Sequence, residues 1–197
     1  DGNNVVIQNT ESDANGAGGR GINVQRGARA VLSNVFLDGN RDVSFIVFGD
    51  DSQVDASNLA ISNTRVSACA ENPNQDCPWV GGGWGDGFVV IGGADVSLND
   101  FSVQDNARVG LYFYDVAGTG YETLPNPMTG FPTVAAENGN ITNNQYGINI
   151  RGESVTPSDF TMVGCYDNEK TVDGCYSDMN LSVPDPSELI SEISSLD

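Results

Sequence analysis

Short runs of alternating hydrophobic and polar residues recur along this chain at an almost constant spacing. In residues 87–111 the runs are Phe88-x-Val90, Val96-x-Leu98 and Phe101-x-Val103, followed by Asn106. In residues 21–45 they are Ile22-x-Val24, Ala30-x-Leu32 and Val35-x-Leu37, followed by Asn40. Leu111 follows Phe88 by 23 positions, and Phe45 follows Ile22 by the same number. A repeat in the twenties with three strand-like runs predicts an all-β solenoid, the right-handed parallel β-helix, of about five coils.

The repeat covers residues 1–176 and begins partway round a coil, at Val5-x-Ile7. In the fourth coil the pattern is one residue short near Gly139. In the fifth it reads Phe160-x-Met162 with Cys165 in the last position. The equivalent polar positions of the earlier coils are Thr10, Asn40, Thr64, Asn106 and Asn144. Such a series predicts a structural ladder at a turn, with amides and hydroxyls stacked about 4.8 Å apart.

Two insertions and a tail interrupt the repeat. The insertions span about 68–87 and 117–132. The tail, 177–197, contains a capping-box pattern around Asp185, Pro186 and Glu188. Its apolar residues Leu189, Ile190, Ile193 and Leu196 then follow a helical period. We expect a C-terminal helix that covers the end of the solenoid, or, as the alternative, one that docks on a partner.

The chain is strongly acidic. Its 197 residues have a formal charge of −19 and include no histidine. This charge disfavours binding to nucleic acid or anionic lipid, and no apolar run is long enough to insert into a membrane. A solvated acidic surface is the simplest explanation of the charge.

The four cysteines form two close pairs, Cys69 with Cys77 and Cys165 with Cys175. Neither pair has a C-x-x-C spacing, and no histidine is present to complete a zinc site. We therefore expect two local disulfides, which indicate an extracellular or cell-surface protein.

The segments NNQYGINI (143–150) and GNRDVSFIV (39–47) resemble the repeat of the right-handed parallel β-helix, or pectin-lyase-like, superfamily. The resemblance is closest to non-enzymatic repeat modules of large exported bacterial proteins. The superfamily includes polysaccharide lyases and hydrolases, tailspikes and adhesins, so the resemblance alone implies no single function.

The inventory of side chains excludes several reactions. Catalytic triads and histidine-bound zinc need a histidine that the chain lacks. Asp50 and Asp51 faintly resemble the paired aspartates of polygalacturonases, but the other motifs of those enzymes are absent. We expect no catalytic residues and no cofactor, with calcium near Asp50, Asp51 and Asp55 as the one metal to consider.

The first run of coils two to four is hydrophobic on both sides. Its outward positions are Ile46, Phe48, Val89, Ile91, Tyr112 and Tyr114. Soluble monomers rarely leave such a patch bare, so we expect the insertions to cover it. The alternative is partial cover that leaves an aromatic platform for sugar rings. The residues predicted to form this platform are Trp79, Trp84, Tyr112, Tyr114 and Tyr121.

The sequence thus predicts an exported non-catalytic module with a structural or recognition role, with polysaccharide or another surface protein as its partner. The alternative function is a polysaccharide-active lyase or glycoside hydrolase. Because the repeat begins in mid-coil, its first strand has an unpaired edge. We expect this edge to pair with upstream coils, with a neighbouring copy of the chain or with a lid. The alternative is a trimmed fragment whose blunt end is kept soluble by charge.

Overall fold

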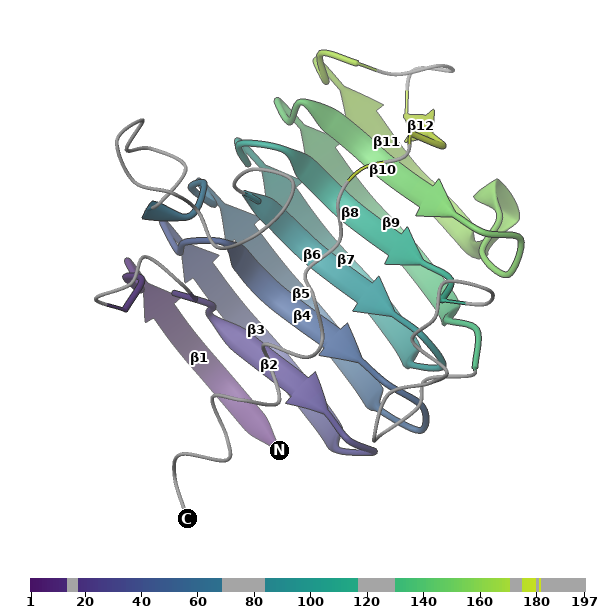
Figure 1. Cartoon of the computed structure of the whole chain (residues 1–197), viewed down its shortest axis with the longest axis horizontal. Helices are drawn as coiled ribbons and strands as arrows, with labels where there is room; N and C mark the ends of the chain where they lie inside the picture. Colours follow the sequence, from purple (N-terminus) through teal and green to yellow (C-terminus); the bar gives the residue numbers. More distant parts are fainter. Residues whose placement is uncertain (14–17, 69–83, 117–129, 171–174, 180, 182–197) are drawn as a thin grey trace.

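The computed structural model describes residues 1–13, 18–68, 84–116, 130–170, 175–179 and 181. These residues form two six-stranded parallel sheets (Figure 1). Sheet A contains, in spatial order, β1 (Gly2–Gln8), β3 (Arg29–Asp38), β5 (Gln53–Ser62), β7 (Asp95–Gln104), β9 (Thr133–Thr142) and β11 (Phe160–Tyr166). Sheet B contains β12 (Tyr176–Ser177), β10 (Tyr146–Arg151), β8 (Val109–Tyr114), β6 (Asp86–Ile91), β4 (Val43–Phe48) and β2 (Ile22–Gln25). The predicted all-β, parallel organisation is confirmed.

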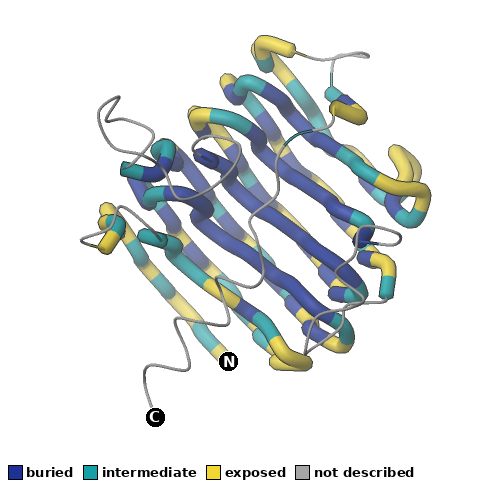
Figure 2. The backbone as a smooth tube through the Cα atoms, in the orientation of Figure 1, coloured by how far each residue is buried: buried dark blue, intermediate teal, exposed yellow. Residues whose placement is uncertain are grey.

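The chain visits the two sheets in turn, so each strand pairs with the strand two places further along the chain. Ile22 pairs with Phe45, Phe45 with Phe88, and Phe88 with Leu111. The inward side chains of both sheets meet in one core, where the rings of Phe113 and Phe160 lie 5.5 Å apart. Figure 2 shows that burial is most continuous in the middle strands. No helix among the described residues is long and apolar enough to span a membrane.

The second and third predicted runs of each coil are one bent strand of sheet A. The bend in β3, β5, β7 and β9 is a residue with positive φ, namely Asn34, Asn58, Asp100 and Asn138. Asn and Asp tolerate this left-handed conformation better than most residues. The bend changes the phase of the alternation, so that Ala56 and Leu59, three positions apart, both point into the core.

The prediction of a missing residue near Gly139 is wrong. Strand β9 pairs with β7 without a gap, from Thr133 with Asp95 to Thr142 with Gln104. Gly139 occupies the inward position that Phe101 occupies one strand away. A Cβ at Gly139 would overlap the Phe101 ring, because this ring fills the space above the glycine. The pattern appeared short because a core position lacks a side chain.

The assignment of Met162 and Cys165 in the last full coil is also wrong. Met162 is the residue with positive φ at the bend, and its side chain is 72% exposed. The inward residues are Val163, beside Gly139, and Cys165, beside Ile141. Asn168, three residues after Cys165, therefore takes the ladder position.

The polar ladder is confirmed in two parts, Thr10 with Asn40 and Thr64 through Asn168, and the Ser44 hydroxyl lies between them, 3.5 Å from Asn40 Nδ2 and 2.7 Å from Thr64 Oγ1. Asn40 Oδ1 accepts a hydrogen bond from the backbone N–H of Thr10 (3.2 Å), and Asn106 Oδ1 accepts one from Thr64 (3.1 Å). Asn144 Oδ1 accepts from the backbone and side-chain nitrogens of Asn106, at 3.0 and 2.9 Å. Asn168 Oδ1 accepts from the Asn144 backbone at 3.0 Å. These buried amides satisfy the backbone where it turns from sheet A toward sheet B, a structural role.

The predicted disulfide between Cys165 and Cys175 is present and links the end of β11 to the start of β12. Both cysteines pack against the last part of the core. The predicted Cys69–Cys77 bond and the predicted helix near the C-terminus lie outside the described residues.

Candidate functional site

The outward apolar residues of sheet B form a second buried cluster. Ile46, Val89, Ile91 and Tyr112 are fully buried, and Phe48 and Tyr114 almost so. Among the described residues of the C-terminal segment, Leu181 packs against this cluster, and its carbonyl accepts a hydrogen bond from the Tyr112 hydroxyl at 3.0 Å. The structure thus places Tyr112 inside the protein, where its ring faces are not available to a ligand.

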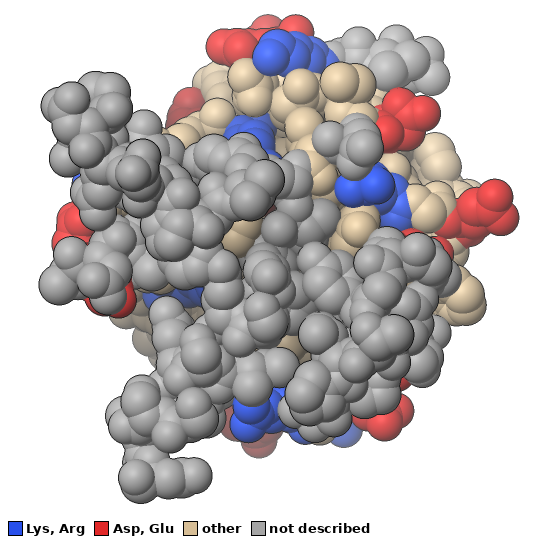
Figure 3. Space-filling view, in the orientation of Figure 1, with Lys and Arg blue, Asp and Glu red and all other residues tan. Residues whose placement is uncertain are grey.

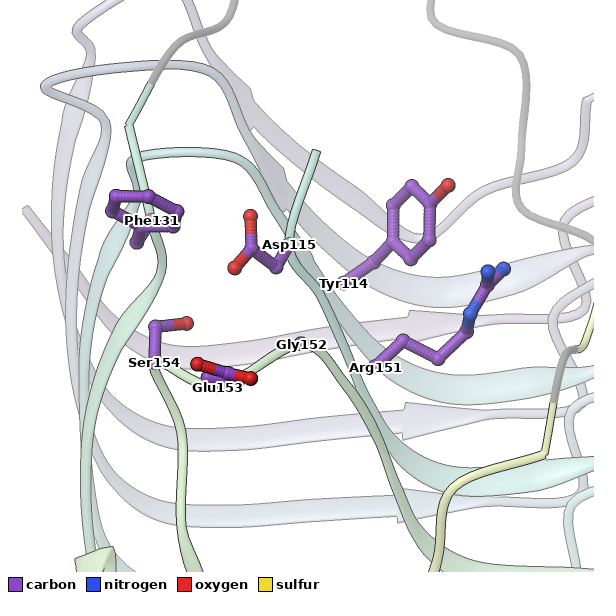
Figure 4. A pocket seen from close by; sticks show the side chains of 7 residues that line it. All are labelled: Tyr114, Asp115, Phe131, Arg151, Gly152, Glu153 and Ser154. Atoms are coloured by element: carbon purple, nitrogen blue, oxygen red, sulfur yellow. The ribbon is translucent and has the colours of Figure 1, made fainter. Parts of the chain in front are cut away.

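The other residues predicted to form the aromatic platform do not lie together in one described surface. Trp84 is buried just before β6. Trp79 and Tyr121 lie outside the described residues. Tyr114 lies at the end of β8, where it is 7% exposed and lines an open hollow of about 570 Å³. Among the described residues, the others that line it are Asp115, Phe131, Arg151, Gly152, Glu153 and Ser154 (Figure 4).

Two adjacent turns of the chain build this hollow. Tyr114 ends β8 and Arg151 ends β10, and these residues pair side by side in sheet B. The backbone N–H of Asp115 donates to the Arg151 carbonyl at 2.8 Å, which continues the pairing beyond the strands. Gly152 has a φ of +120°, and any Cβ there would overlap Asp115. Glycine is therefore required for the two turns to approach each other.

Arg151 is held in place by two contacts. Its guanidinium lies over the Tyr114 ring, 4.8 Å from the centroid, and Nη1 donates to the Leu181 carbonyl at 3.3 Å. A cation over an aromatic face is attracted to it, more strongly where water is excluded. Arg151 thus borders the hollow at one end. Figure 4 shows its guanidinium pointing away from the Asp115 and Glu153 carboxylates, which lie toward Phe131 and Ser154.

Phe131 supplies an exposed aromatic surface at the rim of the hollow. Its side chain is 53% exposed, and it lies two residues before β9. Asp50 holds the chain just before Phe131 in place. Its Oδ1 accepts hydrogen bonds from the backbone nitrogens of Gly93 (3.2 Å) and Gly130 (3.0 Å). Asp50 therefore has a positioning role next to the hollow.

The other aspartates considered for calcium do not gather around Asp50. Asp51 is a turn residue with positive φ, and Asp55 forms an exposed ion pair with Arg29 at 2.9 Å. Within the described parts of the chain, no three acidic or cysteine side chains lie together in a way that could hold a metal ion.

A buried ionic network lies at the opposite end of the sheet B strands, and the sequence analysis missed it. Arg108 Nε donates to Asp86 Oδ1 at 2.7 Å, and Arg20 Nε donates to Asp42 Oδ2 at 3.1 Å. Asp86 is fully buried and also accepts from the backbone N–H of Val109 at 3.2 Å. In each of the two pairs the arginine and the aspartate are 22 residues apart along the chain, so no local motif indicates the pairing. On the face in Figure 3, the visible basic side chains form small separate groups.

This network predicts an unusual pH dependence of stability. Burial raises the pKa of Asp42 to about 6, although the nearby Arg20 opposes the shift. At pH values between the unfolded pKa near 3.8 and the folded pKa, Asp42 is protonated in the folded protein but ionised in the unfolded chain. Asp42 therefore favours folding most below pH about 4, and this contribution falls by about 3 kcal/mol as pH rises above 6.

Comparison of wild type with Asp42→Asn by urea unfolding at pH 4.5 and pH 7.5 measures this contribution. We expect the variant to gain stability relative to wild type by about 2–3 kcal/mol between the two pH values. Subtracting the variant from wild type at each pH cancels the contributions of other carboxylates to stability. One of these is Asp38, whose pKa is lowered mainly by its hydrogen bond with Asn63, so its contribution changes with pH in the opposite direction. A wild-type-to-variant difference that is the same at both pH values would contradict the assignment.

No family model matches this chain, and no curated protein or solved structure matches it either. Functional inference therefore depends on the site itself.

Proposed function

We propose that the chain is an exported, non-catalytic module of the right-handed parallel β-helix, pectin-lyase-like class, and that it recognises a neutral carbohydrate. The alternation of the chain between two parallel sheets and the stacked amide ladder support the solenoid assignment. The disulfide between Cys165 and Cys175 supports an oxidising, extracytoplasmic compartment.

The observation that carries the proposed binding function is the hollow at the ends of β8 and β10. Its volume is within the usual range for ligand pockets, roughly 300–1,000 Å³. Phe131 offers an exposed ring on which the apolar face of a sugar can stack, and the carboxylates of Asp115 and Glu153 and the Ser154 hydroxyl suit hydroxyl groups. Because the side chains that line the hollow carry both signs of charge, a neutral polyhydroxylated ligand fits it better than a strongly charged one.

Phe131→Ala tests this proposal. In a panel of neutral and acidic oligosaccharides, the parent should bind a neutral glycan, and the variant should bind it at least about tenfold more weakly, or 1.4 kcal/mol. Phe36→Ala is the matched control, because Phe36 is an exposed phenylalanine on the outer face of sheet A. Unchanged affinity in Phe131→Ala, or an equal loss in Phe36→Ala, would refute the binding role of the hollow.

Glycoside hydrolysis is the second candidate, because the carboxylates of Asp115 and Glu153 both line the hollow. Glycosidases use two such groups, one as an acid and one as a base or nucleophile. Prolonged incubation with the bound glycan distinguishes the two functions. If cleaved product accumulates with the parent and is absent with both Asp115→Asn and Glu153→Gln, the function is glycoside hydrolysis and not recognition alone.

A further inference from the structure

Strand β9 carries the triplet Asn140-Ile141-Thr142, which has the N-x-[ST] pattern of an N-glycosylation acceptor. Ile141 is fully buried in the core, whereas Asn140 is exposed and Thr142 is partly exposed. Because side chains alternate along a strand, the asparagine amide and the threonine hydroxyl both lie on the outer face of sheet A.

The neighbours of Asn140 leave space around its side chain. Asn140 pairs with Ser102 of β7 on one side and with Gly164 of β11 on the other. The ring of Tyr166 lies over Gly164, where an added Cβ would be 2.6 Å from it. Tyr166 itself is 59% exposed, so an aromatic ring lies next to the asparagine on the open face.

The amide of Asn140 differs from neighbouring amides on this face. Asn58 donates to Asn34 at 2.8 Å, and Asn138 donates to Asn99 at 3.2 Å. Within the described structure, the Asn140 side chain takes part in no such hydrogen bond, and its modification would break none.

We propose that Asn140 is the acceptor of an N-linked oligosaccharide. The donor is a polyprenyl-diphosphate-linked oligosaccharide, used by an N-oligosaccharyltransferase. The Asn140 nitrogen forms a bond to the anomeric carbon and loses one proton, while the bond from that carbon to the diphosphate breaks and the lipid diphosphate leaves with the electron pair. Because the backbone of β9 is hydrogen-bonded to β7 and β11, the transfer takes place before β11 pairs with β9.

The attached glycan would project from the outer face of sheet A, with Tyr166 available to pack against its first sugar. The Cys165–Cys175 disulfide is consistent with this modification, since both are acquired in extracytoplasmic compartments.

Secretion of the full chain from cultured eukaryotic cells, followed by peptide mapping, tests the proposal. Tryptic cleavage after Arg108, Arg151 and Lys170 separates Asn140 from the similar triplet at residues 180–182. We expect most secreted molecules to carry a glycan on the 109–151 peptide. An N-glycan-releasing amidase should remove it and convert Asn140 to aspartate.

Thr142→Ala should abolish this modification, and Thr142→Ser should retain it. Gln104→Ala is the control that changes an exposed amide on the neighbouring strand, beside Thr142, and leaves the triplet intact. Comparison of Thr142→Ala with Thr142→Ser tests the acceptor role of Asn140 even if the direct variant Asn140→Gln fails to fold and is not secreted. Secreted wild-type protein without a glycan at Asn140, or a glycan that persists in Thr142→Ala, would overturn the proposal.

Discussion

Replacing Phe101 with alanine is expected to lower the free energy of unfolding by about 3–5 kcal/mol. Phe101 is buried in the middle of sheet A, where it pairs with Leu59 on one side and Gly139 on the other. Its ring fills the space that the missing side chain of Gly139 leaves. The shorter side chain would leave a cavity that neighbouring strands, fixed by their hydrogen bonds, close only in part.

The same contact predicts a coupling between two positions. Gly139→Ala alone should destabilise the protein by about 1–3 kcal/mol, because the added methyl group overlaps the Phe101 ring. In the Phe101→Ala background, the added methyl group should be neutral or stabilising. Urea unfolding of the four proteins in this cycle should give an interaction energy of about 1–3 kcal/mol. Additive effects would show that Phe101 does not occupy the space above Gly139.

Asp86→Ala is expected to cost a similar 3–5 kcal/mol, for an electrostatic reason. The substitution removes the Asp86 carboxylate that pairs with the Arg108 guanidinium, whose side chain is 11% exposed. It also removes the acceptor for the Val109 backbone N–H. A buried charge without a partner is far more costly than an exposed one.

Asp55→Ala is the matched control, because it removes the same side chain from the exposed pair with Arg29. We expect this control to change the free energy of unfolding by less than about 1 kcal/mol. Thermal or urea unfolding of both variants at neutral pH makes the comparison. Equal losses of stability would contradict a special role for the buried network.

The core of the fold could be predicted from the sequence because inward side chains repeat with every coil. Val47, Val90 and Phe113 point into the core as expected. The bends could not be placed, because Asn34 and Asn58 look like ordinary polar residues until their positive φ is known. The error at Met162 has the same origin, because this methionine occupies the bend with positive φ where the four preceding strands of sheet A have Asn or Asp.

The candidate site was predicted less well, because it depends on contacts between distant parts of the chain. Alternation shows that Tyr112 and Tyr114 point away from the first core, but it does not show what covers them. Phe131 and Arg151 border the same hollow because β8, β9 and β10 follow one another along the chain but are divided between the two sheets. Neither residue belongs to a recognisable motif.

The most direct test of the proposed recognition function is an experimentally determined structure of the protein with the best-binding neutral oligosaccharide. We predict that a sugar ring lies against Phe131, with its hydroxyl groups near Asp115, Glu153 and Ser154, and with its glycosidic bonds intact. An oligosaccharide bound elsewhere on the molecule, or cleaved in the hollow, would contradict this account.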